Sequence, residues 1–343
     1  MPTLMPSLSI VIPAFKQPQW IGRTIDAATI AVERSGFERT EIVVVVADSE
    51  TRDVLTGLRP SLPLRVLDEE RPGRFAARRQ GVEAATGELV LLLDSRIAIT
   101  PDSLRFVSDR IEHEHGDDLP IFSAHFEFNV ENPYGRFWSV IIPLVWWRYY
   151  SAPRTTSFGL EEYDRYAKST TCFLAPRELL LEAKAQFTSH YADSRNVSDD
   201  TGLIRLLAAR QPINVSPHFA CIYASHDSYR AFMYNVFHRG KTFVDSYGRP
   251  GTRFFGLVLA YFPLSLLAAA AALRRPRPAL RAALATPIPF AAAAMTLRRD
   301  RASVASLAWV GPNWLAAMCA GLWYGLWLAL RGRLDRGGRG IDP

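Results

Sequence analysis

The stretch GRFAARRQGVEAATGELVLLLDSR, residues 73–96, indicates the fold of this chain. Residues 73–85 predict a helix, and the strongly apolar residues 88–93 predict a buried strand. Three polar residues, Asp94, Ser95 and Arg96, follow directly where that strand ends. A helix that leads into a buried strand is one repeating unit of an α/β sheet, so further units are expected on either side.

Shorter apolar runs predict the neighbouring strands. Residues 8–13 and 64–67 are short strand patterns. Residues 41–47 contain Ile-Val-Val-Val-Val, which is apolar on both faces, as in parallel strands that are covered on both sides. Residues 19–34 and 101–113 have helical patterns. Because strands alternate with helices, we expect an α/β domain with a mainly parallel sheet.

The middle of the chain is less regular. It predicts strands at residues 120–130, 169–175 and 213–224 and helices at residues 199–209 and 227–247. In parallel sheets, ligands bind at the carboxyl ends of the strands. The predicted strands are not followed by a GxGxxG or GxxxxGK[ST] pattern, which argues against a nicotinamide cofactor and against a P-loop nucleotide site.

The composition excludes some classes of protein. The 343 residues are 48% hydrophobic, so the chain is expected to form a sizeable core. The net charge is +6, and only four of the 40 basic residues are Lys, so the chain relies on Arg, which suits bidentate contacts to phosphates and carboxylates. Three widely spaced Cys predict no disulfide framework and no zinc site, and they fit a reducing compartment. We expect no nucleic-acid partner, because the sequence has no basic stripe with interleaved aromatic residues.

The pattern changes after about residue 250. Three apolar stretches, residues 254–273, 282–297 and 303–330, are separated by Arg clusters and followed by a basic tail. A spanning helix needs about 20 apolar residues, so we expect a soluble-type domain at 1–250 and membrane-associated helices at 251–343. Basic loops prefer the cytoplasmic side, which three alternating spans would not satisfy. We therefore expect one or more stretches to be re-entrant or interfacial, with simple two- or three-span anchoring as the alternative.

Five pieces of the chain, in order, resemble family 2 glycosyltransferases with a GT-A fold. The resemblance covers about residues 8–248. Residues 9–15 match the first strand and nucleotide-binding turn, and residues 42–53 match the second strand and acidic turn. Residues 73–94 match the run into the first Asp of an Asp-x-Asp motif, and residues 199–205 match the pair of acids that carries the catalytic base. His226, followed by residues 235–241, matches the acceptor-side helix of membrane members. The resemblance implies a Rossmann-like nucleotide-binding sheet followed by a hydrophobic helical membrane region.

The resemblance also implies roles for single residues. Asp200 matches the catalytic base, with Asp199 as the alternative, and a single base implies inversion at the sugar carbon. The implied nucleotide-binding residues are Pro13, Ala14, Phe15, Asp48, Arg74, Arg78, Asp94 and Arg96. The implied acceptor-side residues are His226, His238, Arg239 and Lys241.

Three departures from the family pattern bear on the chemistry. Arg96 stands in place of the second Asp of Asp-x-Asp, Ala47 stands where an Asp is common, and Asn235-Val236-Phe237-His238-Arg239 replaces Gln-x-x-Arg-Trp. A guanidinium cannot coordinate a cation, so Asp94 would be the one carboxylate left to hold Mg²⁺ or Mn²⁺. Two alternatives stay open: a weaker metal site at Asp94, or a metal-independent reaction in which Arg side chains neutralise the diphosphate.

The sequence thus predicts an inverting glycosyltransferase at the inner (cytoplasmic) membrane, with its catalytic domain facing the cytoplasm. Its donor would be a nucleotide-diphosphate sugar and its acceptor a lipid-linked or membrane-proximal glycan, in the synthesis of a cell-envelope polysaccharide or glycolipid. One alternative is a catalytically degenerate scaffold of the same fold, motivated by Arg96 and Ala47. Another is a transferase of the same fold that uses a non-UDP activated donor.

Each acidic candidate also has a purely structural interpretation. Asp48 follows a strand, where it would serve as a helix cap. Asp94 and Arg96 would form a local ion pair. Asp199 and Asp200 would be ordinary first-turn helix charges, which are common at helix starts.

Overall fold

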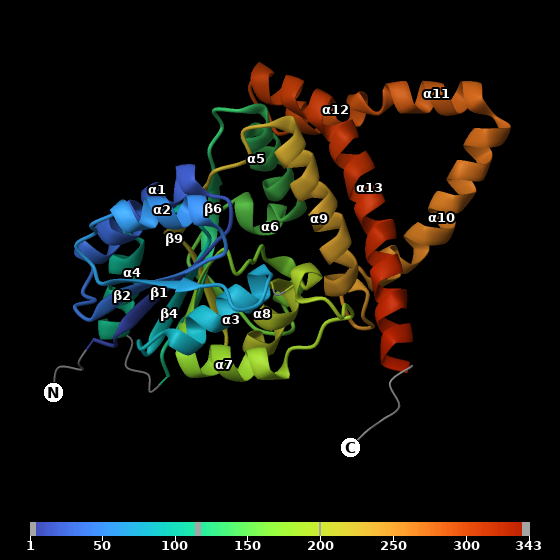
Figure 1. Ribbon diagram of the computed structural model, residues 1–343. Helices are drawn as coiled ribbons and strands as arrows, with labels where there is room; N and C mark the ends of the chain where they lie inside the picture. Colours follow the sequence, from blue (N-terminus) through green and yellow to red (C-terminus); the bar gives the residue numbers. More distant parts are fainter. Residues whose placement is uncertain (1–4, 114–117, 199, 338–343) are drawn as a thin grey trace. The chain divides into compact units, whose positions relative to one another are not determined.

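The computed structural model describes residues 5–113, 118–198 and 200–337. The chain divides into two compact units (Figure 1). Unit 1 comprises Met1–Glu127, Trp146–Thr188 and Asp199–Ala224, and unit 2 comprises Phe128–Val145, Ser189–Ser198 and Ser225–Pro343. The predicted boundary near residue 250 does not coincide with this division, because two internal segments and the helix before residue 250 group with the apolar helices that follow them.

Unit 1 is built on one sheet whose first four strands are parallel. They are β1 (Leu8–Ala14), β2 (Thr40–Val46), β3 (Leu64–Asp68) and β4 (Leu89–Leu93), in the order β3-β2-β1-β4. In β2, every residue after Glu41 is buried, as the run of valines predicted. The predicted parallel α/β sheet is therefore confirmed for this half.

The other half of the sheet is antiparallel. Its strands are β8 (Cys172–Pro176), β6 (Ile121–Phe128), β9 (Ile213–Tyr223), β5 (Ile97–Ile99) and β7 (Thr156–Phe158). β8 pairs antiparallel with β4, and β5 and β7 both pair with β9. The chain order does not show this reversal, because it depends on pairing between strands about 80 residues apart, Leu91 opposite Leu174 for example.

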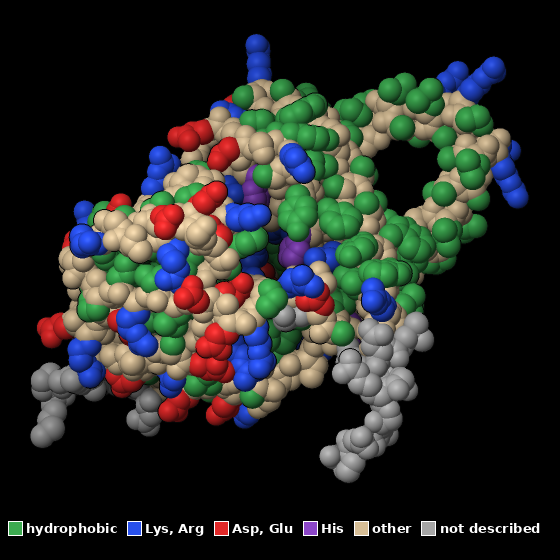
Figure 2. Space-filling view, in the orientation of Figure 1, with side chains coloured by type: hydrophobic (Ala, Val, Ile, Leu, Met, Phe, Trp, Pro, Cys, Tyr) green, Lys and Arg blue, Asp and Glu red, His purple; other side chains and the backbone are tan. Residues whose placement is uncertain are grey.

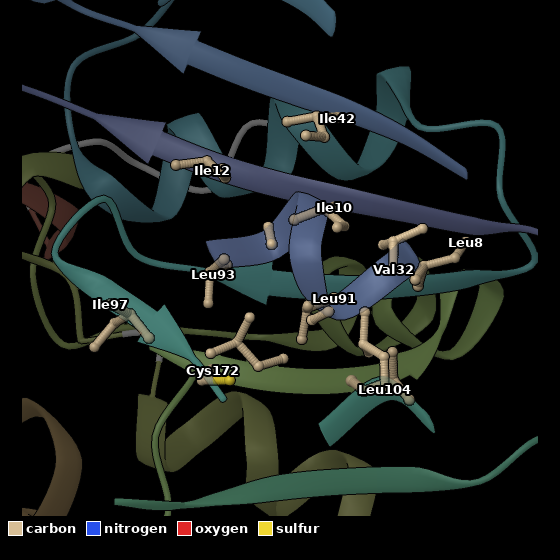
Figure 3. Close-up of a cluster of buried hydrophobic side chains, with 14 of the residues drawn as sticks. Leu8, Ile10, Ile12, Val32, Ile42, Leu91, Leu93, Ile97, Leu104 and Cys172 are labelled. Carbon is tan, nitrogen blue, oxygen red and sulfur yellow. The ribbon is translucent and has the colours of Figure 1, made fainter. Parts of the chain in front are cut away.

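Helices cover both faces of the sheet (Figure 1). The elements of unit 1 are α1 (Pro18–Glu33), α2 (Ser49–Gly57), α3 (Arg74–Ala84), α4 (Ser103–His113), α6 (Trp147–Tyr150), α7 (Arg177–Gln186) and α8 (Asp200–Ala208). On one face, α1, α2 and α4 pack on Ile10, Ile42 and Leu91 (Figure 3). On the other, α3, α7 and α8 pack on Val11, Val43 and Val90. Alternate residues of each strand thus enter two separate cores.

Unit 2 is helical. It contains α5 (Pro133–Val145), α9 (Tyr229–Tyr247), α10 (Phe255–Arg274), α11 (Pro276–Ala285), α12 (Pro287–Thr296) and α13 (Arg301–Gly337). Among the described residues, three helical stretches are long and apolar enough to cross a membrane, namely Phe255–Arg274, Pro276–Thr296 and Arg301–Gly332. They correspond to the three apolar stretches of the sequence. Figure 2 shows hydrophobic side chains over α10, α11 and α12, with basic side chains gathered where α10 meets α11.

Glycines let α13 approach α9 closely. A Cβ atom on Gly321 would lie within 3 Å of the Phe237 carbonyl oxygen, and one on Gly325 within 3 Å of the Lys241 carbonyl oxygen. Gly240 of α9 faces the same contact. Small residues four apart on one helix face are the usual way for two backbones to meet without intervening side chains.

Replacing Gly321 by Ala should therefore lower the melting temperature of the detergent-solubilised protein. The new methyl group has no room, and overpacking of this kind costs about 1–3 kcal/mol. Gly256→Ala, on α10, is the matched control, because nothing lies within 4 Å of its Cβ position. At that open helical position, Ala should be neutral or stabilising by up to about 1 kcal/mol. Equal melting temperatures for the two variants would contradict the close packing.

Candidate active site

Several predicted residues lie at one edge of the sheet. Because β1, β2 and β4 are parallel, their carboxyl ends share that edge. β1 leads into Phe15, β2 is followed by Asp48, and β4 by Asp94. Pro13 and Ala14 are the last residues of β1; Ala14 is buried, whereas the Phe15 side chain is 57% exposed. The edge therefore offers an open aromatic side chain next to two acidic turns.

Asp48 organises the turn after β1. It is the N-cap of α2, where its Oδ1 accepts the Thr51 amide at 2.9 Å. Its Oδ2 accepts the Lys16 amide at 2.6 Å, and Lys16 has a left-handed backbone with φ 53°. Burial acts to raise the pKa of Asp48, but these backbone hydrogen bonds outweigh it and hold the pKa below its usual value. The interpretation of Asp48 as a helix cap is therefore correct. The same side chain also shapes the turn around Phe15.

A buried arginine joins the two principal carboxylates. Arg78 lies on the inward stripe of α3, with Ala77, Gly81 and Val82. Its side chain is only 1% exposed; Nη2 donates to Asp94 Oδ1 at 2.6 Å, and Nη1 lies 3.7 Å from Asp200 Oδ1. The missing side chain at Gly81 lets α3 lie against Val11 of β1. The sequence named all three charged residues, and the structure brings them together in one cluster.

Asp200 is held as an ionised carboxylate. Thr170 donates to Asp200 Oδ1 from its amide, at 3.1 Å, and from its hydroxyl. Burial acts to raise the pKa of Asp200, but the charge of Arg78, the hydrogen bonds from Thr170 and the charge of Arg74 together hold it below its usual value. The Asp200 side chain is still 38% exposed, so a ligand can reach it.

Arg96 is fixed beside this cluster by stacking. Its guanidinium carbon lies 5.3 Å from the centre of the Trp20 ring, and its Nε donates to the Ala224 carbonyl at 3.2 Å. The preceding Ser95 is buried, and its carbonyl accepts the Thr24 hydroxyl of α1 at 3.0 Å. The turn from Asp94 to Arg96 is therefore held by Trp20 and Thr24 of α1.

The remaining predicted residues are dispersed. Arg74 is exposed at the first turn of α3. The predicted acceptor-side residues His226, His238, Arg239 and Lys241 belong to unit 2. There, Arg239 stacks on Trp138 at 4.7 Å, whereas Lys241 is buried and donates to Asn196 Oδ1 at 2.7 Å. Burial lowers the pKa of Lys241. Asp199 lies outside the described residues.

The residues at Asp94 do not form a metal centre of the usual kind. Within the described ranges, no three His, Cys, Asp or Glu side chains come together as a metal-binding group. Asp94 Oδ1 is engaged by Arg78, and the position that would supply a second carboxylate carries Arg96. Hard divalent cations need several oxygen ligands, and a nearby guanidinium opposes them. The donor set therefore suits an anion better than a divalent cation.

Two important residues were not identified from the sequence. Thr170, which holds Asp200, precedes β8 in a Ser-Thr-Thr run that resembles any strand start. Trp20, which supports Arg96, lies in the first turn of α1. No local pattern marks either residue, because each acts through a partner at least 30 residues away in the chain.

Arg78→Met should strongly destabilise the protein at neutral pH. It leaves two carboxylates facing each other without their cation, and removing one partner of a buried ion pair costs about 3–5 kcal/mol. Because the pKa of Asp200 is lowered by folding, its contribution is present above the usual pKa of an Asp and disappears as the pH falls through the folded value. The difference from wild type should therefore shrink below about pH 4. Denaturant titrations at several pH values, with exposed Arg79→Met as the matched control, measure both effects; a pH-independent difference would contradict the ion-pair cluster.

Known proteins resemble this chain in sequence and in fold. The sequence matches the family Glycosyl transferase family 2 over residues 9–181, which is about half of the chain and includes Asp48, Arg78 and Asp94. No curated protein sequence matches the chain.

Solved structures are similar to this chain at low sequence identity. A mannosyltransferase from Pyrobaculum calidifontis, PcManGT, in complex with GDP-Man and Mn²⁺, has a TM-score of 0.54 and 18% identity, over 95% of this chain and 88% of that one. TarS 1–349 from S. aureus, with UDP-GlcNAc, has a TM-score of 0.46 and 17% identity, over 70% of this chain and 67% of that one. Glucosyl-3-phosphoglycerate synthase from Mycobacterium tuberculosis has a TM-score of 0.44 and 16% identity, over 72% and 82%. Taken with the family match, the buried sheet and its acidic edge lead to one conclusion: this chain is a glycosyltransferase of family 2, with a GT-A fold.

Proposed function

We propose that the protein transfers a sugar, with inversion, from a nucleotide-diphosphate sugar to a hydroxyl group. The observation that carries this proposal is the cluster in which buried Arg78 contacts both Asp94 and Asp200. It supplies a carboxylate that is kept ionised, partly exposed and next to a second acidic turn at the carboxyl edge of the sheet. A donor of this class is bound in the structure of the mannosyltransferase PcManGT.

Asp200 is the proposed general base. The acceptor hydroxyl oxygen bonds to the anomeric carbon, and its proton passes to the Asp200 carboxylate. The bond from that carbon to the diphosphate breaks, and its electron pair leaves with the nucleoside diphosphate. A single base on the side opposite the leaving group gives inversion. The low pKa of Asp200 keeps it in the proton-accepting form at neutral pH.

Arg96 and Arg74 are the proposed partners of the diphosphate, together with the turn of Pro13, Ala14 and Phe15. Guanidinium groups pair with phosphate oxygens through two parallel hydrogen bonds, which neutralise the charge that builds on the leaving group. The stacking of Arg96 on Trp20 holds that side chain in place. We propose that Asp48 contributes to nucleotide binding by fixing the turn around Phe15.

The proposed acceptor is a lipid-linked or membrane-proximal glycan at the inner membrane, with the catalytic domain facing the cytoplasm. Three helical stretches with membrane-like length and composition support a membrane location. Arg239 and His238 on α9 are the proposed acceptor-side residues. Synthesis of a cell-envelope polysaccharide or glycolipid is the process that would use such a product.

One observation favours a second candidate, a scaffold that binds a nucleotide sugar without transferring it. Arg96 replaces a carboxylate that the family pattern places there, and the same change would fit loss of metal-assisted catalysis. Such a scaffold would still bind the nucleotide, and Asp200 would have no catalytic role in it.

Asp200→Asn separates the two candidates. Transfer should fall by about 100- to 10,000-fold, the usual contribution of a general base, while nucleotide-induced thermal stabilisation is retained. Radiolabelled nucleotide sugars and membrane extracts supply donor and acceptor for the rate measurement. Asp102→Asn, whose carboxylate forms an exposed ion pair with Arg34, is the control and should leave the rate unchanged. Unchanged transfer in Asp200→Asn would exclude the proposed base.

Transfer should also persist in excess EDTA, because the described residues of the cluster offer too few oxygen ligands for a divalent cation. Arg96→Ala should then lower the rate by about 100- to 1,000-fold, as expected when a charge-stabilising donor is lost. Arg23→Ala is the matched control, since Arg23 also lies over Trp20, at 5.4 Å, but on α1. Arg96→Asp should make transfer depend on added Mn²⁺. An absolute metal requirement in the native enzyme would disprove the arginine-based mechanism.

A further inference from the structure

The longest apolar helix, α13, runs side by side with α9. The two helices are parallel: Tyr229 near the start of α9 donates to Asn313 Oδ1 at 2.9 Å, and Phe237 lies 5.6 Å from Tyr324 between ring centres. Farther along, the Lys241 carbonyl meets Gly325. The contact therefore covers most of α9 and the middle of α13.

A second helix, α5, packs on the beginning of α13. Arg136 Nη1 lies 2.9 Å from Asp300 Oδ2, and the Ser306 hydroxyl donates to the Pro133 carbonyl. Phe137 of α5 contacts Trp314, with ring centres 5.6 Å apart. One stripe of α13 is thus buried by protein, including Leu307, Val310 and Leu322.

The neighbour α9 is not a membrane helix. It carries Arg239, Lys241 and Asp245 beside the apolar part of α13. Asp245 accepts the amides of His190, at 2.7 Å, and of Ser198, at 3.0 Å, and so ties the polar segment 189–198 to α9. A bilayer around α13 would bring these groups into hydrocarbon, where each charged residue costs about 2.5–3.5 kcal/mol even on the most lenient scale.

The helices α10, α11 and α12 have a different environment. Val258 and Ala294 are their only buried residues among those described. Large apolar side chains are open on all of them, for example Leu267 at 66% and Leu284 at 72% exposure. At 20 residues, α10 is about 30 Å long, which matches the hydrocarbon thickness, and the run from Pro276 to Thr296 has a similar length.

We propose that α10 and the α11–α12 run form a hairpin that crosses the bilayer twice, while α13 stays with α5 and α9 on the side where the hairpin starts. The inference rests on the proposed membrane location. It also resolves the arrangement of the basic loops. Three alternating spans would place two Arg clusters, residues 274–281 and 331–339, away from the starting side, whereas the hairpin places only the first cluster there.

The exposed apolar side chains of α10, α11 and α12 therefore lie in an anionic bilayer. Arg298 and Arg299 precede α13, Arg301 begins it and Arg331 lies near its end, whereas the acidic residues of the sequence after residue 253 are Asp300, Asp335 and Asp342. Trp309, Tyr324 and Trp327 of α13 keep 41–50% of their surface exposed. Amphipathic aromatic rings and arginines are the groups that proteins place at the headgroup level.

Single-cysteine labelling tests this topology. The parent is Cys319→Ala, in which Cys172 and Cys221 stay buried and should not react. Asp227→Cys reports the side of α9, Arg277→Cys the tip of the hairpin, and Arg331→Cys the end of α13. Each is treated with a membrane-impermeant maleimide in intact cells and again after permeabilisation. Arg275→Cys and Leu330→Cys repeat the last two positions, so one poorly folded variant does not decide the result.

The expected result is that Asp227→Cys and Arg331→Cys behave alike and Arg277→Cys behaves in the opposite way. If Arg331→Cys matches Arg277→Cys, α13 crosses the membrane and the proposal fails. If Arg277→Cys matches Asp227→Cys, the hairpin does not cross and the proposal also fails. The comparison concerns relative sides only, so it is independent of transfer activity and of whether the catalytic domain faces the cytoplasm.

Discussion

The contact of one buried guanidinium with two carboxylates is the constraint on which the structure of unit 1 depends. Arg78 is almost fully buried, and Asp94 and Asp200 both lie against its charge. These three groups come from α3, from the end of β4 and from the start of α8. Because burying an unpaired charge is so costly, the helix on one face and the acidic turn at the edge of the sheet have to assemble together.

The same contact explains how acidic residues with different tasks coexist at one edge. Asp94 is mostly covered, with 18% of its side chain exposed, and it serves as the close partner of Arg78. Asp200 lies farther from Arg78, is anchored by Thr170 and remains partly open. Asp48 uses both oxygens to shape the backbone of the turn at Phe15. Differences in distance and exposure, rather than residue type, thus distinguish an ion-pair partner, the proposed base and a structural cap.

Local sequence patterns predicted the first half of the sheet well. The valine run of β2 and the leucine run of β4 are long, strongly apolar and bounded by turns, so their boundaries were correct to within about one residue. The antiparallel pairing of β8 with β4 was not predictable in this way, since it depends on contacts between distant segments. For the same reason Thr170 and Trp20 escaped notice, whereas Asp94 and Asp200 were named because each stands at a recognisable strand end or helix start. The periodicity of α3 also held a usable signal: Arg78 falls on the buried stripe and Arg79 does not.

The division of the chain has a consequence for the order in which the protein is made. Every strand of the sheet has been synthesised by Tyr223, before any of the apolar helices after residue 254 leaves the ribosome. The catalytic unit can therefore begin to fold while the membrane segments are still being translated, as domains commonly do. Residues 128–145 and 189–198 cannot complete their packing then, because their partners α9 and α13 come later. The apolar surface of α5 is exposed during that interval and must not aggregate. The interval is short when the last hundred or so residues are translated promptly.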